Sequence, residues 1–192
     1  MKQKLVLASA SVRRRELLYR IASDFIAVPS EITEQATGNP EHQVFSLARA
    51  KAHAVAKHES GIIIGADTLV VLDNEILGKP CSYNEAKYML KRLSKRRHTV
   101  ITGLYVLATE SGEYRKACER TDVYFRTLTE IEIEAYLESG EYVDKAGAYA
   151  IQGLASLFIE RINGDYFNVM GLPLCRLYLL LRAMGVDLLR KG

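Results

Sequence analysis

Apolar and polar stretches along the chain predict both strands and helices. Ile62-Ile63-Ile64 is a short continuous apolar run, which is typical of a buried strand. Asp73-Asn74 separates two further apolar runs and predicts the turn of a hairpin. The complete set of predicted strands covers residues 4–8, 25–28, 62–64, 68–72, 75–77, 99–108, 119–125 and 157–162.

The predicted helices are recognised from apolar residues at helical spacing and from residues that cap helix starts. Asn39-Pro40 places a capping side chain before a proline at the first helical position. Ser82 and Thr129 are each followed three residues later by a glutamate, which is the pattern of a capping box. The predicted helices cover about residues 11–22, 40–58, 82–93, 129–137 and 171–184.

Strands and helices alternate over the 192 residues without a linker, a repeat or a low-complexity segment. This pattern predicts an α/β fold with a mixed sheet, and we expect residues 1–192 to form one domain with two lobes. A composition of 48% hydrophobic and 26% charged residues excludes disorder, collagen and a coiled coil as the main state. The uncharged stretch from His98 to Thr109 is too short to span a membrane.

Charge favours an anionic partner only near the N-terminus. The net charge of +3 is too small to indicate nucleic acid by itself. Within the first twenty residues a single acid, Glu16, stands against several bases, so we expect either a phosphate ligand or a solvated helix face. Three scattered cysteines without metal-ligand spacing, and an N-terminal apolar run too short for a signal peptide, predict a cytoplasmic protein.

The loop after the first predicted strand has the composition of a phosphate-binding site. Small residues from Ala8 to Ser11 let the backbone approach an anion, and amide groups at a helix start donate to it. Arg13 and Arg14 would bind phosphate oxygens through their guanidinium groups. Because the spacing of a P-loop is absent, a plain strand-to-helix connection with a basic exposed face stays the alternative.

Asp67 is the strongest candidate for acid–base chemistry. It follows the predicted strand at Ile62–Ile64 after two small residues, and the carboxyl end of a buried strand is where α/β sheets place catalytic groups. The alternative is a strand-ending aspartate that forms a turn. Lys79, between Gly and Pro, would present a fixed cation, or belong to an ordinary turn. Lys51 lies on the apolar stripe of its helix, so its ammonium must reach solvent or an anion.

Two further features point to ligands. Glu31 and Glu34 follow the second predicted strand and could hold a divalent cation, with a solvated loop as the alternative. Gln152 lies among small and apolar residues and is expected to be buried, where its amide needs a partner. That amide could accept from N3–H and donate to O4 of uracil or thymine and reject cytosine. A core glutamine bonded to the backbone is the alternative.

Taken together, these segments resemble the Maf nucleotide pyrophosphatases over nearly the whole chain. Lys51, in Ala-Lys-Ala, and the strand at Thr121–Arg126 also fit the family's pattern. The motifs that carry the resemblance are Ala-Ser-Ala-Ser-Val-Arg-Arg at residues 8–14, Gly-Ala-Asp-Thr at 65–68, Gly-Lys-Pro at 78–80, Asp-Lys-Ala-Gly-Ala-Tyr-Ala-Ile-Gln-Gly at 144–153 and Gly-Leu-Pro at 171–173.

The resemblance implies hydrolysis of nucleoside triphosphates to monophosphate and pyrophosphate with a Mg²⁺- or Mn²⁺-type ion. It also implies an inosine-triphosphatase-like α/β fold, with helices flanking a mixed twisted sheet and a cleft between two lobes. By the resemblance, Asp67 is the proton acceptor or a metal ligand, and Glu34 is a second ligand. Arg13, Thr68 and Gln152 stand where the dTTP/UTP pyrophosphatase branch has its specificity residues. The phosphate-binding residues would be Ser9, Arg13, Arg14, Lys51 and Lys79.

Three positions depart from the family's pattern. Val12 replaces a usual proline, and Thr33 stands where an aspartate is common. Lys95 replaces a glycine, so a left-handed backbone there would be strained.

The expected partner is a nucleoside triphosphate, with no nucleic acid and no membrane, and a homodimer stays open. A non-catalytic nucleotide-binding regulator of septum formation is one alternative, and it predicts binding without product. A nucleic-acid binder that uses Arg13 to Arg15 is another, and it predicts steeply salt-dependent binding.

Overall fold

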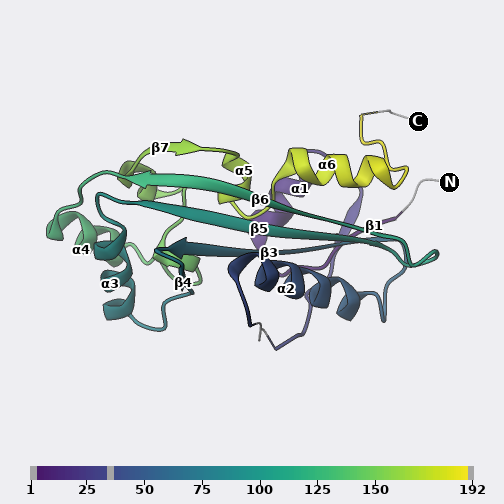
Figure 1. Ribbon diagram of the computed structural model, residues 1–192, viewed down its shortest axis with the longest axis horizontal. Coiled ribbons are helices and arrows are strands. Elements are labelled where there is room, and N and C mark those ends of the chain that lie inside the picture. The colour runs from purple at the N-terminus through teal and green to yellow at the C-terminus, as the bar shows by residue number, and fades with distance from the viewer. Residues whose placement is uncertain (1–3, 34–36, 190–192) are drawn as a thin grey trace. The chain divides into compact units, whose positions relative to one another are not determined.

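The computed structural model describes residues 4–33 and 37–189, and within these ranges seven strands form one sheet (Figure 1). The strands are β1 (Leu5–Leu7), β2 (Phe25–Ala27), β3 (Ile62–Leu72), β4 (Glu75–Leu77), β5 (Arg97–Ala108), β6 (Tyr114–Phe125) and β7 (Ile159–Asn163). Their order is β2-β1-β3-β5-β6-β7, with β4 paired to β3. β1 runs parallel to β2 and β3, whereas β4 and β7 are antiparallel to their partners, so the predicted mixed α/β sheet is confirmed.

Helices begin where the capping residues predict. The helices are α1 (Val12–Tyr19), α2 (Pro40–Val55), α3 (Tyr83–Leu93), α4 (Glu130–Glu138), α5 (Tyr166–Val169) and α6 (Leu174–Ala183), with 3₁₀ turns at η1 (Ala146–Ala148) and η2 (Leu154–Phe158). Thr129 and Glu132 form a complete capping box at the start of α4. At α3 the Ser82 side chain accepts from the Glu85 amide, but the Glu85 carboxylate accepts from the Cys81 amide, so this capping box is only half formed.

The described chain divides into two compact units. Unit 1 comprises residues 1–67, 102–119 and 171–192, and unit 2 comprises residues 68–101 and 120–170. The chain passes from one unit to the other within β3, β5 and β6 and again at the start of the segment that leads to α6.

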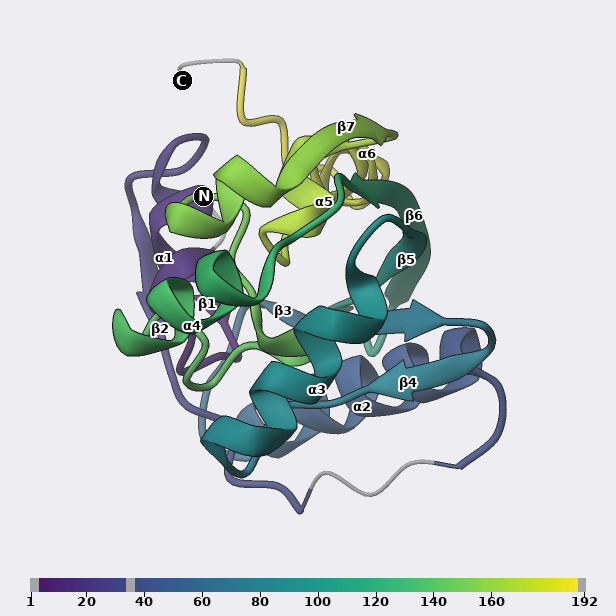
Figure 2. The ribbon, with the colours of Figure 1, turned by 90° about the vertical axis from the view of Figure 1, so that its left-hand side faces the viewer.

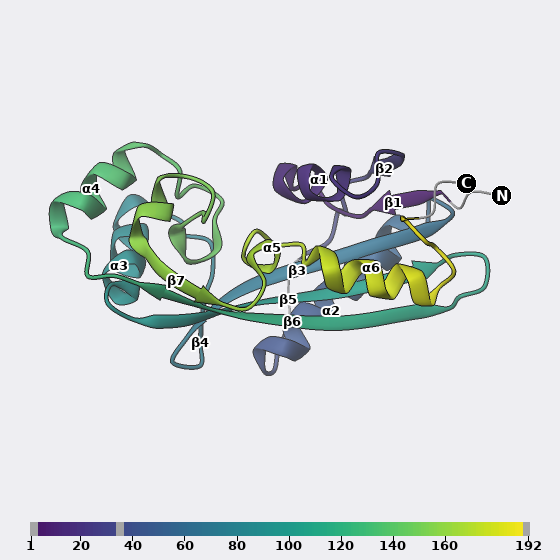
Figure 3. The same ribbon diagram turned by 90° about the horizontal axis from the view of Figure 1, so that it is seen from above.

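In unit 1, α2 lies along one face of the strands and α6 along the other (Figures 1 and 3). Two glycines bring α2 close to the sheet. A Cβ on Gly65 would lie 2.1 Å from the Ala48 carbonyl oxygen, and a Cβ on Gly103 would lie 2.7 Å from the Val44 carbonyl group. The buried cluster between α2 and the strands consists of Val6, Ala8, Ala48, Ala52, Val55, Ile63, Tyr105 and Leu107.

Unit 2 has its own core, in which α3 packs beside α4 (Figure 2). Phe125 lies at the centre of this core and contacts the rings of Tyr149 and Phe158 edge-on, at centroid distances of 5.0 and 6.1 Å. Leu90 and Leu93 of α3 are fully buried against the same cluster. Each such side chain contributes about 1.5–3 kcal/mol of burial energy to the folded state.

The structure corrects one part of the predicted pattern and confirms another. The strands predicted at 62–64 and 68–72 are one continuous strand, β3, because Gly65 accommodates α2 and does not end the strand. The predicted turn at Asp73-Asn74 is present, and both residues have positive φ, at 51° and 67°. Lys95 also has a left-handed backbone, with φ at 59°, which is the conformation in which the missing glycine is expected to cause strain.

Candidate functional site

The loop that links β1 to α1 is held by its own serines. Ser9 is buried at the end of β1, and its hydroxyl oxygen accepts from the Ser11 amide at 3.2 Å. Ser11 caps α1, accepting from the Arg14 amide at 3.4 Å. Val12 is the first residue of α1, so the helix begins where the loop motif predicts. The loop thus places the start of a helix beside a buried serine.

Arg14 joins the first loop motif to the last one. Its Nε donates to the Gly171 carbonyl oxygen at 2.8 Å, which ties α1 to the Gly-Leu-Pro segment before α6. Arg13, one residue earlier, is half-buried, whereas Arg15 is exposed. Two motifs that lie far apart in the sequence therefore belong to one local structure in unit 1.

A buried ion pair is the central polar feature of unit 1. Lys51 of α2 donates from Nζ to Asp67 Oδ1 of β3 at 2.6 Å, and the two residues are only 7% and 5% exposed. Lys51 lies among buried apolar residues of α2, and its ammonium finds an anion, one of the two outcomes that the sequence predicts. The close approach at Gly65 brings α2 near enough to β3 for this contact.

The structure corrects the predicted place of Asp67. This residue was expected at the carboxyl end of a short strand, but it lies in the interior of the 11-residue strand β3. Burying a charged pair inside a folded unit costs desolvation free energy. Replacing only one of the two charged residues is strongly destabilising, because the other charge stays buried without its partner. Because a buried ion pair is weak evidence for stability, we treat Lys51 and Asp67 as candidates for function.

Three of the predicted site residues, Thr68, Lys79 and Gln152, belong to unit 2. Thr68 follows Asp67 in β3 and is half-buried, and Lys79 is exposed after β4. The Gly78 carbonyl oxygen accepts from the Gly147 amide at 3.0 Å, so the Gly-Lys-Pro motif pairs with the segment at 144–153.

The prediction that Gln152 is buried is wrong. Gln152 is exposed, in a turn between η1 and η2. The small residues around it serve the backbone: Gly147 has φ at 68° and packs against Val70, and Ala148 has φ at 62°. Because the Gln152 amide is exposed, solvent can satisfy its hydrogen bonds, and a ligand can reach it.

One buried contact in unit 2 could not be expected from the sequence pattern. His98 Nε2 and the Tyr149 hydroxyl lie 2.8 Å apart, and His98 is 2% exposed. Burial lowers the pKa of His98 from 6.5 to about 3 and raises the pKa of Tyr149, so both groups stay neutral at ordinary pH. Because Tyr149 is part of the segment at 144–153, this contact anchors the segment that carries Gln152.

The described residues hold no preformed metal cage. Within residues 4–33 and 37–189, no three His, Cys, Asp or Glu side chains are grouped so that they could hold a metal ion. Glu34, the predicted second metal ligand, lies outside the described residues, and Glu31 is exposed. In the same ranges, no helix is both long and apolar enough to cross a membrane.

Comparisons with known proteins cover almost the whole chain. A family model described as Maf-like protein matches residues 4–184. A dTTP/UTP pyrophosphatase of Moorella thermoacetica is 50% identical over 187 residues, covering 96% of each chain. A protein of the same name from Thermoanaerobacter sp. strain X514 is 46% identical over 97% of this chain and all of its own.

A solved structure with a similar backbone is described as the structure of the Staphylococcus aureus Ham1 protein. It has a TM-score of 0.48 and 16% identity, and it covers 64% of this chain and 72% of its own.

Proposed function

Because the chain belongs to the Maf family, we propose that it hydrolyses nucleoside triphosphates, foremost dTTP and UTP, to the monophosphate and pyrophosphate. The relatives with nearly half of their residues identical to this chain carry the name of that activity. The observation that carries the proposal on this chain's own residues is the buried contact between Lys51 and Asp67, because the carboxylate that could activate water is held in one position by a cation.

The proposed chemistry follows from the charge of the substrate. A triphosphate carries about four negative charges, which must be neutralised before water can attack phosphorus. Arg13, Arg14 and Lys51 of unit 1 supply cations for this purpose, and Ser9 supplies a hydroxyl group. Lys79 of unit 2 is assigned to the phosphates on the match of its motif with the family. Asp67 would orient and deprotonate the water, or bind a metal that activates it.

A divalent cation fits this donor set only when the substrate shares in binding it. Asp67 offers one carboxylate, and its Oδ1 already accepts from the Lys51 ammonium. Mg²⁺ is commonly held by one or two carboxylates together with substrate phosphates and water. We therefore propose that a Mg²⁺- or Mn²⁺-type ion binds with the triphosphate, held by Asp67 and Glu34. When bound, the ion would neutralise phosphate charge.

Asp67→Asn tests the proposed role of the carboxylate. We expect this variant to lower pyrophosphate release from dTTP and UTP at least ~100-fold, the scale of lost acid–base catalysis. Loss of the charge should lower stability, but the amide oxygen can still accept from the Lys51 ammonium, so the protein should remain folded in the assay. The measurement is pyrophosphate release from a panel of triphosphates with Mg²⁺ or Mn²⁺.

Asp73→Asn is a matched control, because Asp73 lies exposed at the turn after the same strand, and it should leave release unchanged. Near-normal turnover of Asp67→Asn would refute the assignment. Saturable binding of nucleotide by the wild type without any product would favour a regulator.

Gln152→Ala tests the proposed reading of the base, which together with Arg13 and Thr68 would set specificity. The amide would accept from N3–H and donate to O4 of uracil or thymine, so its loss should change the ratio of dTTP to CTP hydrolysis more than the rate summed over all nucleotides. Gln43→Ala, which removes an amide from α2, should leave the ratio unchanged. An equal loss with every nucleotide would contradict the role of Gln152.

A further inference from the structure

Unit 1 contains a groove that the proposed catalytic residues do not line. It runs between α2 and the hairpin formed by β5 and β6, and it consists of two adjoining hollows of ≈ 380 and ≈ 250 Å³. Arg49, Tyr105 and Tyr114 line both hollows, so the two are continuous. Ligand pockets commonly have volumes of roughly 300–1,000 Å³, so the groove has room for a small molecule. We call it the α2–hairpin groove.

The helical repeat separates the groove from the buried ion pair. The α2 residues that line the groove recur every three or four positions, so they form one stripe on the helix. Lys51 is two residues from Arg49 and two from His53, which is about 200° around the helix, and it points to β3. A ligand in the groove would therefore contact a different face of α2. The residues of the stripe are His42, Phe45, Ser46, Arg49, His53 and Ala56.

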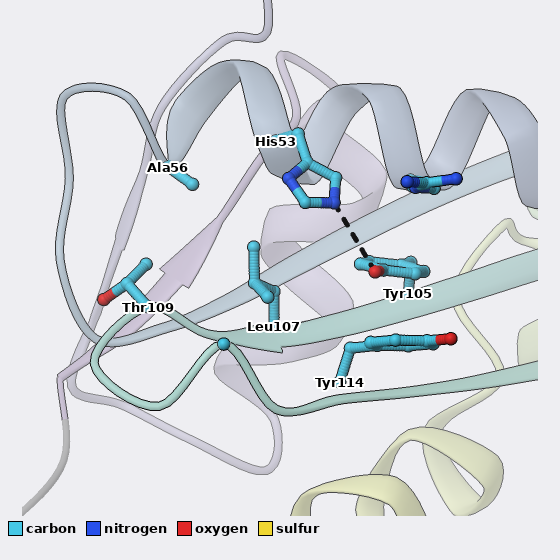
Figure 4. A pocket seen from close by; sticks show the side chains of 8 residues that line it. His53, Ala56, Tyr105, Leu107, Thr109 and Tyr114 are labelled. Carbon is cyan, nitrogen blue, oxygen red and sulfur yellow. Dashed lines mark hydrogen bonds between the residues drawn. The ribbon is translucent and has the colours of Figure 1, made fainter.

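Stacked rings form the middle of the groove. Tyr105 of β5 and Tyr114 of β6 are nearly parallel, with centroids 5.0 Å apart and an interplanar angle of 15°. His53 of α2 points toward Tyr105, with its Nε2 3.5 Å from the phenol oxygen (Figure 4). Tyr114 is 49% exposed, so aromatic surface is open to the groove. Aromatic side chains of this kind stack on flat heterocycles.

Beside these rings, one end of the groove is an apolar slot. Three of its lining residues are Ala56 at the C-terminal end of α2, Leu107 of β5 and Thr109 just after β5 (Figure 4). Gly112, in the turn between β5 and β6, adds no side chain, and a Cβ built there would meet nothing within 4 Å. The slot thus offers an apolar floor with an open edge, which suits a planar ring.

The other end of the groove is basic. Arg49 and Lys116 line it, together with His42, and none of the described lining residues is Asp or Glu. Lys116 lies over the Phe45 ring at 5.2 Å. Burial raises the pKa of Tyr105, and the nearby Arg49 guanidinium opposes this rise, so Arg49 acts on the Tyr105 phenol. Two cations held beside aromatic rings without an acid favour binding of an anion.

We propose that the α2–hairpin groove binds a nucleotide, with its base in the slot beside His53 and its phosphate against Arg49 and Lys116. A phosphorylated planar heterocycle matches both ends of the groove at once, whereas inorganic phosphate would use only the basic end and a nucleoside only the slot. This site is additional to the one proposed for hydrolysis, and it does not depend on that activity.

The test is a titration of the full-length protein with UMP, uridine and inorganic phosphate, followed by NMR of the Tyr105 and Tyr114 rings and the Gly112 amide. UMP has no anhydride bond, so binding is measured without turnover. We expect UMP to shift these signals and to bind at least ~10-fold more tightly than uridine or phosphate. Shifts confined to Ser9, Arg13 and Asp67 would overturn the proposal.

Variants separate the two ends of the groove. Arg49→Gln with Lys116→Gln should weaken UMP binding at least ~10-fold and reduce its dependence on salt. Ala56→Leu should fill the slot, weakening UMP but not inorganic phosphate. Arg115→Gln is the matched control, because Arg115 neighbours Lys116 on β6, is exposed and does not line the groove.

Two outcomes would contradict the proposal. If Arg115→Gln weakened UMP as much as the double variant, the attraction would belong to the general charge of the surface. If an oligothymidylate shifted the same signals at lower concentration than UMP, the ligand would be single-stranded nucleic acid.

Pyrophosphate release, measured on the same variants, should stay at the wild-type rate. A protein that binds UMP in the groove but hydrolyses nothing would refute only the proposed hydrolysis.

Discussion

Gly65→Ala should disturb both the stability of unit 1 and the geometry of its ion pair. The added Cβ would lie 2.1 Å from the Ala48 carbonyl oxygen, and Cβ contacts under 3.0 Å are essentially never seen. The helix and the strand must therefore separate by at least about 3.0 − 2.1 = 0.9 Å. Both contacting groups are fixed by regular backbone, so no side-chain rotation can relieve the clash.

The cost can be worked out from this displacement. Overpacking a well-filled core costs about 1–3 kcal/mol, and we expect the upper half of that range because backbone must move. For a chain of this size, 2–3 kcal/mol corresponds to a fall in Tm of roughly 5–10 °C. Lys51 lies one turn after Ala48, so the same shift would stretch its 2.6 Å contact with Asp67 toward 3.5 Å. Under the proposed function, turnover should fall about 10- to 100-fold.

Thermal unfolding by circular dichroism and pyrophosphate release measure the two effects separately. Gly78→Ala is the control, because a Cβ there would meet nothing within 4 Å and Gly78 has no positive φ. It should unfold within about 1–2 °C of the wild type. A Gly65→Ala protein with unchanged Tm would refute the steric argument. Lower Tm with full turnover would show that the ion-pair distance does not limit the reaction.

Two further predictions concern stability alone. Burial lowers the pKa of His98 to about 3 in the folded protein, so the unfolded chain binds a proton at higher pH than the folded chain does. The free energy of unfolding therefore falls as the pH falls from about 6.5 toward 3, by up to about 1.4 kcal/mol per pH unit. His98→Gln should flatten this acid limb in urea unfolding between pH 7 and 5 by about 2 kcal/mol. Lys95→Gly should raise Tm by about 1–4 °C, since relief of left-handed strain exceeds the added chain entropy.

Each of these predictions has a simple control. His58 is exposed, so His58→Gln should keep the wild-type dependence of stability on pH. An acid limb that His98→Gln leaves unchanged would assign the loss of stability to other groups. Lys95→Ala removes the same side chain but keeps the strained backbone, so it should not raise Tm. A gain with alanine equal to the gain with glycine would mean that charge, and not φ, is responsible.

Local sequence rules predicted those parts of the fold that depend on a few neighbouring residues. The starts of α2 and α4 follow from Asn39-Pro40 and Thr129, whose side chains satisfy backbone donors within one turn. The apolar stripe of α2 also indicated that the Lys51 ammonium needs an anion or solvent. Such features require no knowledge of distant segments.

Features that depend on distant segments could not be predicted. Gly65 was interpreted as the end of a strand, but the reason for glycine is the approach of α2, which the local sequence does not reveal. Gln152 was expected to be buried because its neighbours are small, yet those neighbours serve left-handed backbone and contacts with Val70. The partner of His98 lies 51 residues away, so no local pattern could identify it.

The discontinuous make-up of unit 1 has a consequence for biosynthesis. The last segment of unit 1 begins at Gly171, which is 171 − 67 = 104 residues after Asp67, the end of its first segment. Only after Gly171 has been synthesised can the Arg14 Nε donate to its carbonyl oxygen. At about 5–20 residues per second, this delay is roughly 5–20 s. Early in that interval, before β5 is synthesised, the nascent chain exposes apolar residues of β1 and α2 that pack with Tyr105 and Leu107 in the folded protein. We expect the emerging polypeptide to be a client of ribosome-associated chaperones.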